Sequence, residues 1–171
     1  FTTRDLDLLM GKSNCEKFSG GRGSGIGFVH NETNEFFKCM KIECFQGDDE
    51  KLYQKVARLV MDPKVLKENN NYPFKTSENY RWFVASAKRN VVGFMPVELR
   101  NNSMILNNYY VYGGNEQVLD SLIKAVIQAN EEALNLEAVV LNRDIDVFQR
   151  NNFDIIRRWK LYVKMEWQDQ Q

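Results

Sequence analysis

This chain of 171 residues contains little cysteine and histidine and has no net charge. With three cysteines, one histidine and no C-x-x-C pair, we expect neither a disulfide framework nor a zinc site of the common Cys/His type. The 23 basic and 23 acidic side chains cancel, which removes the simplest argument for a nucleic-acid binder, a global excess of positive charge. No run of 18 apolar residues and no signal-peptide core is visible, so we expect no membrane span and a cytoplasmic location.

The composition that remains is typical of one globular domain, with 43% hydrophobic, 12% aromatic and 27% charged residues. Five of the ten glycines fall within residues 19–27, a stretch that resists regular structure because glycine is costly to order. We therefore expect a glycine-rich N-terminal arm over residues 1–35, with one short helix at 4–10, and a folded domain over 36–171.

Residues 36–167 alternate between strand and helix patterns. Apolar side chains at every second position predict strands at 36–45 and 153–167. Turn residues at 88–90 and 101–102 divide the middle of the chain into strands at 82–87, 91–100 and 103–112, and a further short strand is predicted at 137–141. Helical spacing predicts a helix that opens at 48–50 and runs to about 60, a further turn at 64–68, a long helix that follows Gly113-Gly114-Asn115, and a short helix at 145–150. Pro96 predicts a bulge or an unpaired position in its strand. The expected fold class is mixed α/β (α+β), a central sheet flanked by helices.

Two local patterns in this order are informative. In the first, Val139-Val140-Leu141 ends at Asn142, and a short helix then reads Phe148-Gln149-Arg150-Asn151-Asn152-Phe153. In the second, a strand from Tyr109 turns at Gly113-Gly114 into an apolar helix that continues to Ile127. Over about residues 36–167 the chain resembles the GNAT superfamily of acyl-CoA-dependent N-acetyltransferases, whose short helix typically reads Tyr-Glu-Lys-x-Gly-Phe.

The resemblance implies a GNAT-like fold and transfer of an acetyl group from acetyl-CoA, used as a co-substrate, to an amine that attacks the thioester directly in a ternary complex. Consecutive backbone N–H groups at a helix N-terminus form a natural site for the CoA pyrophosphate. The implied CoA-binding residues are Val111, Gly113, Gly114, Asn115, Glu116, Gln117, Val118, Leu119, Asn142 and Phe148. Gln117 and Leu119 depart from the family pattern, because they occupy its two glycine positions.

The implied catalytic set also departs from the family. Phe148 stands where members often have the tyrosine that protonates the leaving thiolate, and Asn107 and Asn108 stand on the strand where many members have a glutamate. We therefore expect Glu98, on the neighbouring strand, as the base, and Tyr109 or Tyr110 as the acid, with Tyr112 and Tyr162 as further substitutes.

Two other functions stay open. One is a catalytically inert GNAT-like binding or regulatory protein. The other is a nucleic-acid-modifying protein that uses the basic residues between Arg143 and Lys164, although we expect no nucleic-acid partner. The expected partner is a small-molecule or peptide amine, no metal is expected, and the C-terminal strand could pair two copies into a homodimer.

Overall fold

A computed structural model describes residues 39–169 of the chain. The expected arm at 1–35, the helix at 4–10 and the first residues of the strand at 36–45 lie outside the described residues. Within them, the first strand begins at Lys41.

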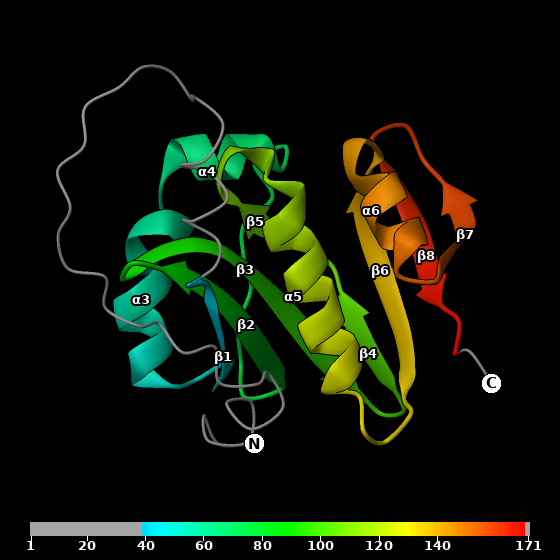
Figure 1. Cartoon of the computed structure of the whole chain (residues 1–171), viewed down its shortest axis with the longest axis horizontal. Coiled ribbons are helices and arrows are strands. Elements are labelled where there is room, and N and C mark those ends of the chain that lie inside the picture. Colours follow the sequence, from blue (N-terminus) through cyan, green and yellow to red (C-terminus); the bar gives the residue numbers. More distant parts are fainter. Residues whose placement is uncertain (1–38, 170–171) are drawn as a thin grey trace, which may run out of the picture.

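All strands of the described chain belong to one mixed sheet (Figure 1). Their order is β1-β2-β3-β4-β6-β8-β7, and the short strand β5 pairs with β3 beside β4. Every pairing is antiparallel except that of β4 with β6. The bounds are β1 (Lys41–Gln46), β2 (Tyr80–Ala87), β3 (Asn90–Arg100), β4 (Ser103–Leu106), β5 (Tyr110–Val111), β6 (Asn135–Leu141), β7 (Phe153–Arg158) and β8 (Tyr162–Trp167). The expected mixed α/β class is confirmed.

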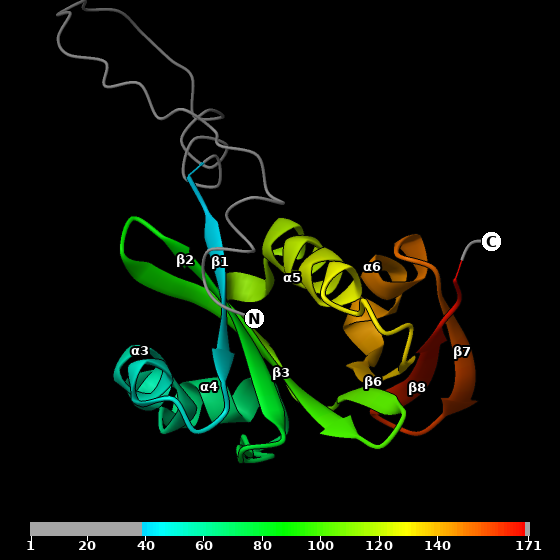
Figure 2. The same ribbon diagram turned by 90° about the horizontal axis from the view of Figure 1, so that it is seen from below.

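Helices cover both faces of this sheet. Helices α3 (Glu50–Val60) and α4 (Pro63–Glu68) lie on one face, and α5 (Glu116–Gln128) and α6 (Ile145–Arg150) lie on the other (Figure 2). Short 3₁₀ turns, η1 (Tyr112–Gly114) and η2 (Asn142–Asp144), precede α5 and α6. Asp49 and Asp62 accept a backbone N–H bond at the starts of α3 and α4, the usual role of an acidic N-cap.

The alternation of side chains along each strand separates two cores. Leu52, Val56 and Val65 of α3 and α4 pack with Trp82, Val84 and Phe94 on one face. The larger core on the other face contains the apolar stripe of α5, including Leu122 and Ile123, which are fully buried. Burial of these apolar faces is the main stabilising contribution to the fold.

The predicted third strand at 103–112 is wrong as one element. Residues 103–106 form β4, residues 107–109 belong to no strand, and 110–111 form β5, which returns to pair with Gly93 and Phe94. On the side of β3 that faces β4 and β5, Pro96 lies in the interval between the two pairings. On its other side Pro96 pairs with Trp82 of β2, and the register shift between β2 and β3 lies at Ala85/Ser86, so the bulge expected at Pro96 is absent and the position is unpaired on one side only.

The predicted long strand at 153–167 is also wrong, because it is the hairpin of β7 and β8. Apolar residues continue at odd-numbered positions through the turn, so the sequence pattern does not indicate where the chain reverses. Phe153, Val163 and Met165 are buried, whereas Trp159 and Leu161 lie in the turn and are 43% and 49% exposed.

Candidate functional site

The sheet opens where β4 ends. Strands β4 and β6 run parallel from Ser103↔Asn135 to Leu106↔Ala138. Beyond this point β5 pairs with β3, whereas β6 continues along β8. Residues 107–109 and 139–141 therefore face each other across a gap in the sheet, with their backbones not paired as strands.

A cavity of about 350 Å³ lies at this gap. Its lining shares aromatic rings, prolines and side-chain amides, contributed by segments far apart in the sequence: Asn69, Tyr72, Pro73, Lys75, Tyr80, Pro96, Asn107, Asn108, Val139, Trp159 and Tyr162. Tyr80 and Pro96 alternate in phase with Trp82 and Phe94, so the cavity opens on the face of the sheet that carries α3 and α4. This volume is at the lower end of the range for ligand pockets.

Side-chain amides tie the loop after α4 to both sides of the gap. Asn108 Nδ2 donates to the carbonyls of Tyr72 and Pro73 at 3.2 and 3.3 Å. On the other side, Asn70 Nδ2 donates to the Tyr162 hydroxyl at 2.8 Å, and that hydroxyl donates to Asn69 Oδ1 at 3.1 Å. The loop therefore spans the gap and forms one wall of the cavity.

Asn108 has an oxygen without a partner. The Tyr72 and Pro73 carbonyls, which accept from Nδ2, fix the orientation of the Asn108 amide. Its Oδ1 is therefore buried without a hydrogen-bond donor among the described residues. A buried polar atom of this kind is uncommon in folded proteins and calls for a physical reason.

Charge is sparse in the cavity. Of the described residues that line it, only Lys75 is charged. Tyr80 is the cross-strand partner of Glu98, and burial, followed by the charge and hydrogen bond of Glu98, raises the pKa of the Tyr80 hydroxyl. Glu98 is not among the lining residues, and its carboxylate pairs with the Arg100 guanidinium at 3.0 Å. Glu98, the predicted base, therefore interacts with Tyr80 but does not line the cavity itself.

The predicted acid Tyr109 crosses the gap on the opposite face. Its hydroxyl donates to Asp144 Oδ2 at 2.6 Å and accepts from the Leu141 N–H at 3.3 Å, so it joins residues 107–109 to the end of β6. Its ring packs on Phe148, with 5.8 Å between centroids. Burial and the Asp144 carboxylate raise the pKa of Tyr109 well above its ordinary value, which holds the proton on the hydroxyl.

Tyr110, the other predicted acid, points to the α3/α4 side and is 7% exposed. Its ring packs on Phe94 at 5.4 Å, and burial raises the pKa of its hydroxyl. Tyr109 and Tyr110 thus face opposite sides of the sheet, and neither lines the cavity. Their neighbours Asn107 and Asn108 do.

The predicted pyrophosphate segment surrounds the start of α5. Gly113 and Gly114 have φ values of 61° and 63°, in the left-handed region, and no atom lies within 4 Å of where a Cβ would be. Asn115 is the N-cap, and its Oδ1 accepts from the N–H groups of Gln117 and Val118 at 3.0 and 3.1 Å. Two of the donors expected to meet a phosphate are therefore occupied by a side chain of the protein.

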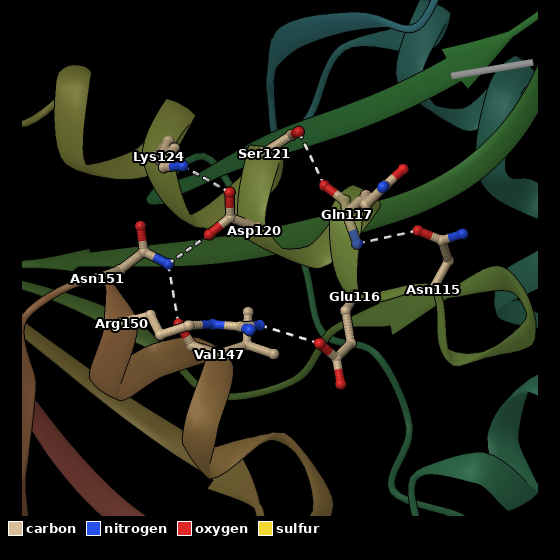
Figure 3. A network of polar contacts seen from close by, with 9 residues as sticks. All are labelled: Asn115, Glu116, Gln117, Asp120, Ser121, Lys124, Val147, Arg150 and Asn151. Carbon is tan, nitrogen blue, oxygen red and sulfur yellow. Dashed lines mark hydrogen bonds and ion pairs between the residues drawn. The ribbon is translucent and has the colours of Figure 1, made fainter. Parts of the chain in front are cut away.

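The remaining residues of that segment have other contacts. Val111, Val118 and Leu119 are buried in the α5-side core. Glu116, in the first turn of α5, pairs with Arg150 of α6 at 3.0 Å, and both side chains are largely exposed (Figure 3). This ion pair lies at the end of α5 where an anion would be attracted.

Deeper contacts between α5 and α6 are built around Asn151. Its Nδ2 donates to Asp120 Oδ1 at 2.8 Å and to the Val147 carbonyl at 2.9 Å, and the other Asp120 oxygen pairs with Lys124 (Figure 3). Burial of Asp120 acts to raise its pKa, but the hydrogen bonds from Lys124 and Asn151 outweigh it, and the pKa is lowered.

The two residues predicted beyond β6 have structural contacts. Asn142 is exposed, and its Nδ2 donates to the Lys160 carbonyl in the β7–β8 turn at 3.0 Å. Phe148 is fully buried between Tyr109 and Phe153. Neither residue lines the cavity at the gap.

Sequence reasoning missed most of the cavity wall. Tyr162 was singled out as a substitute acid, but Tyr72, Tyr80 and Trp159 were not. A local signal for them is lacking, because they come from a loop, a strand end and a hairpin turn that only the folded sheet brings together.

The basic C-terminal residues are largely in contact with other side chains. Arg143 pairs with Asp144 at 3.5 Å, Lys164 pairs with Glu137 at 2.8 Å, and Arg157 lies over the Trp159 ring, 5.6 Å from its centroid. In the part of the chain that the structure describes, no cluster of three acidic, histidine or cysteine side chains is arranged to hold a metal. No helix among the described residues is long and apolar enough to cross a membrane.

Comparison with known proteins gives structural similarity only. No protein-family model matches the sequence, and no curated protein matches it. Among solved structures, the chain is similar to ElaA of Escherichia coli (TM-score 0.62, 9% identity, 75% of this chain and 99% of that one). It is also similar to a putative N-acetyltransferase from Lactobacillus plantarum (0.60, 11%, 75% and 97%) and an acyl-CoA N-acyltransferase from Pseudomonas aeruginosa (0.59, 10%, 75% and 99%). A Campylobacter jejuni N-acetyltransferase, PseH, solved with acetyl coenzyme A, is similar at TM-score 0.51 and 14% identity, over 77% of this chain and 99% of that one.

Proposed function

We propose that this chain, which has the fold of the GNAT N-acetyltransferases, transfers an acyl group from acyl-CoA to an amine. The observation that carries the proposal is the cavity at the gap between β4 and β6, in a fold shared with N-acetyltransferases. Similarity of fold does not by itself identify a reaction. The residues at the gap and at the start of α5 must therefore support it.

The start of α5 can accommodate a diphosphate if one side chain moves. The open glycines Gly113 and Gly114 allow close approach of a ligand to the backbone. Turning Asn115 away would release the N–H groups of Gln117 and Val118, at the cost of an N-cap worth about 1 kcal/mol. Arg150, which is exposed and pairs with Glu116 at the surface, would then meet a phosphate oxygen.

Positioning is the main chemical contribution of the proposed site. The acyl thioester supplies the electrophilic carbon, and the cavity residues would hold the amine against it. Asn107 and Asn108 lie on one side of the gap and Val139 on the other. Glu98, placed behind Tyr80, is proposed as a positioning residue for that tyrosine. Tyr109 is proposed to hold the two sides of the gap together.

A second candidate is a protein of this fold that binds acyl-CoA or another ligand without catalysis. It is favoured by two observations: Phe148 is fully buried and carries no hydroxyl, and Asp or Glu is absent from the described residues that line the cavity.

Calorimetry with acetyl-CoA, followed by thiol release with a panel of amines, distinguishes the two. Binding with release of CoA thiol supports acyl transfer. Binding without release from any amine supports the non-catalytic protein. Absence of binding at millimolar acetyl-CoA contradicts both acyl-CoA proposals.

A further inference from the structure

The cavity at the gap combines aromatic walls with positive charge. Tyr72, Tyr80, Trp159 and Tyr162 contribute rings from three separate segments: the loop after α4, the start of β2 and the β7–β8 hairpin. Tyr72 and Tyr162 meet edge to face with 6.3 Å between centroids. A flat ring of a ligand is therefore favoured over a flexible chain, because aromatic pairs gain contact energy beyond the area they bury.

The charges around the cavity are unfavourable for a cationic ligand. Lys75 is in the lining, and the Arg157 guanidinium lies over Trp159, where it already uses an aromatic face that could have held a cation. Aspartate and glutamate are absent from the described lining residues. A polyamine would therefore find repulsion and no ion-pair partner.

The same charges affect the protonation state of the attacking amine. Only a neutral amine has the lone pair that attacks an acyl carbon, and nearby positive charge favours the neutral form. An alkylamine with the ordinary lysine pKa of about 10.4 is neutral to less than about one part in a thousand at pH 7. With Glu98 behind Tyr80 and paired with Arg100, the described lining residues offer no carboxylate to remove the proton.

We infer that the acceptor is a weakly basic amine on a flat aromatic body that also carries a carboxylate: the amine is neutral without a base, the ring lies among the tyrosines and Trp159, and the carboxylate meets Lys75. A cavity of about 350 Å³ holds an acceptor of about one ring. This inference rests on the proposed acyl transfer.

Four probes test it, each with acetyl-CoA and the full chain at pH 7: 4-aminobenzoate, aniline, 4-(aminomethyl)benzoate and spermidine. In thiol release, the kcat/KM for 4-aminobenzoate is expected to exceed that for 4-(aminomethyl)benzoate at least about tenfold, because only the former has an uncharged amino group at this pH. The kcat/KM for 4-aminobenzoate is expected to exceed that for aniline about two- to fivefold, which is the effect of one exposed ion pair.

Two matched variants locate the carboxylate. Lys75→Gln is expected to abolish the preference for 4-aminobenzoate over aniline. Lys51→Gln removes another exposed lysine, at the start of α3, and is expected to leave the preference unchanged. The kcat/KM for 4-aminobenzoate should also stay flat between pH 6 and 8, whereas that for 4-(aminomethyl)benzoate should rise with pH, because a growing share of its amine is uncharged.

Each outcome separates this inference from the proposed function. Turnover of spermidine or 4-(aminomethyl)benzoate in preference to 4-aminobenzoate overturns the acceptor class and leaves acyl transfer in place. If no amine releases thiol, acyl transfer fails, and ligand-observed NMR then decides whether the cavity binds an aromatic carboxylate of the inferred kind. Binding of 4-aminobenzoate that Lys75→Gln weakens supports that ligand class, and absence of binding overturns it.

Discussion

The N-cap of α5 allows a quantitative test of where the diphosphate of acyl-CoA binds. Asn115 Oδ1 accepts from the N–H groups of Gln117 and Val118 in the free protein. If a diphosphate takes these donors, the amide must leave, and its bonds are lost on binding. The substitution Asn115→Ala removes the bonds beforehand, so the bound protein loses nothing and the free protein loses the cap.

The expected magnitude follows from this cycle. Replacing an asparagine N-cap by alanine costs about 1 kcal/mol, with a range of about 0.5–2. The free protein should therefore unfold roughly 2–4 °C lower. CoA should bind about fivefold more tightly, because about 1.4 kcal/mol corresponds to a factor of ten. The two free-energy changes should be equal in size and opposite in effect.

Titration calorimetry gives the dissociation constant of CoA, and urea unfolding gives the stability of the free protein. The control is Asp49→Ala, which removes the N-cap of α3, a bond of 2.8 Å to the Lys51 N–H, on the other face of the sheet. It should lower stability by a similar amount and leave the affinity for CoA unchanged. An Asn115→Ala protein that binds CoA no better than the original would refute the placement of the diphosphate on these N–H groups.

Three further predictions concern the contacts around the gap. Tyr109→Phe removes the hydroxyl that bonds both the Leu141 N–H and Asp144, which keeps its ion pair with Arg143, and should lower the free energy of unfolding by about 1–3 kcal/mol in urea titration. Because the folded-state pKa of Tyr109 is raised, its contribution is complete below pH 10 and is lost as the pH rises above 10, so the variant should show a shallower alkaline loss of stability. Asn151→Ala removes the bonds to Asp120 and the Val147 carbonyl and should cost about 1–3 kcal/mol, an unchanged Tm being the contrary result. Glu98→Gln should keep kcat/KM for 4-aminobenzoate within about threefold with a flat pH profile, whereas a tenfold loss with a new acid limb would identify Glu98 as a base.

Helical patterns predicted their elements well from sequence. The long apolar stripe after Asn115 indicated α5 within one residue or so of its observed bounds, Glu116–Gln128. The signal was strong because Asn115 is an N-cap and six apolar side chains share one face. A local cap and a local period determine such a helix, so distant residues were not needed to find it.

Strand breaks were harder to predict, since apolar residues continue where the hydrogen bonding changes. Residues 103–106 and 109–112 are mostly apolar, yet β4 pairs with both β3 and β6, whereas β5 pairs with β3 alone. The turn at 159–161 likewise keeps the parity of the strands on either side. The pattern reports which side of the backbone is apolar and contains no information on which strand lies alongside.

The candidate site was only partly visible in the sequence for the same reason. Predicted residues that depended on a contiguous motif, such as Gly113 to Leu119, lie together at the start of α5. The cavity depends on residues from 69 to 162, and four of its rings come from segments with no common pattern. Asn107 and Asn108 were interpreted as replacements for the glutamate of many family members, and the structure shows that they line the cavity.

Each side of the gap is built from one continuous part of the chain. Strands β1–β5 all come from residues 41–111 and strands β6–β8 from 135–167, so each half of the sheet is continuous in sequence. Their strands meet through four parallel residue pairs, Ser103↔Asn135 to Leu106↔Ala138. A cut in the exposed segment 131–133 would leave every antiparallel pair within one fragment. Two such fragments would share the α5-side core, so they should reassemble, and a ligand bound in the gap would contact both and strengthen their association. Fragment reassembly would therefore report ligand binding without requiring any catalytic turnover.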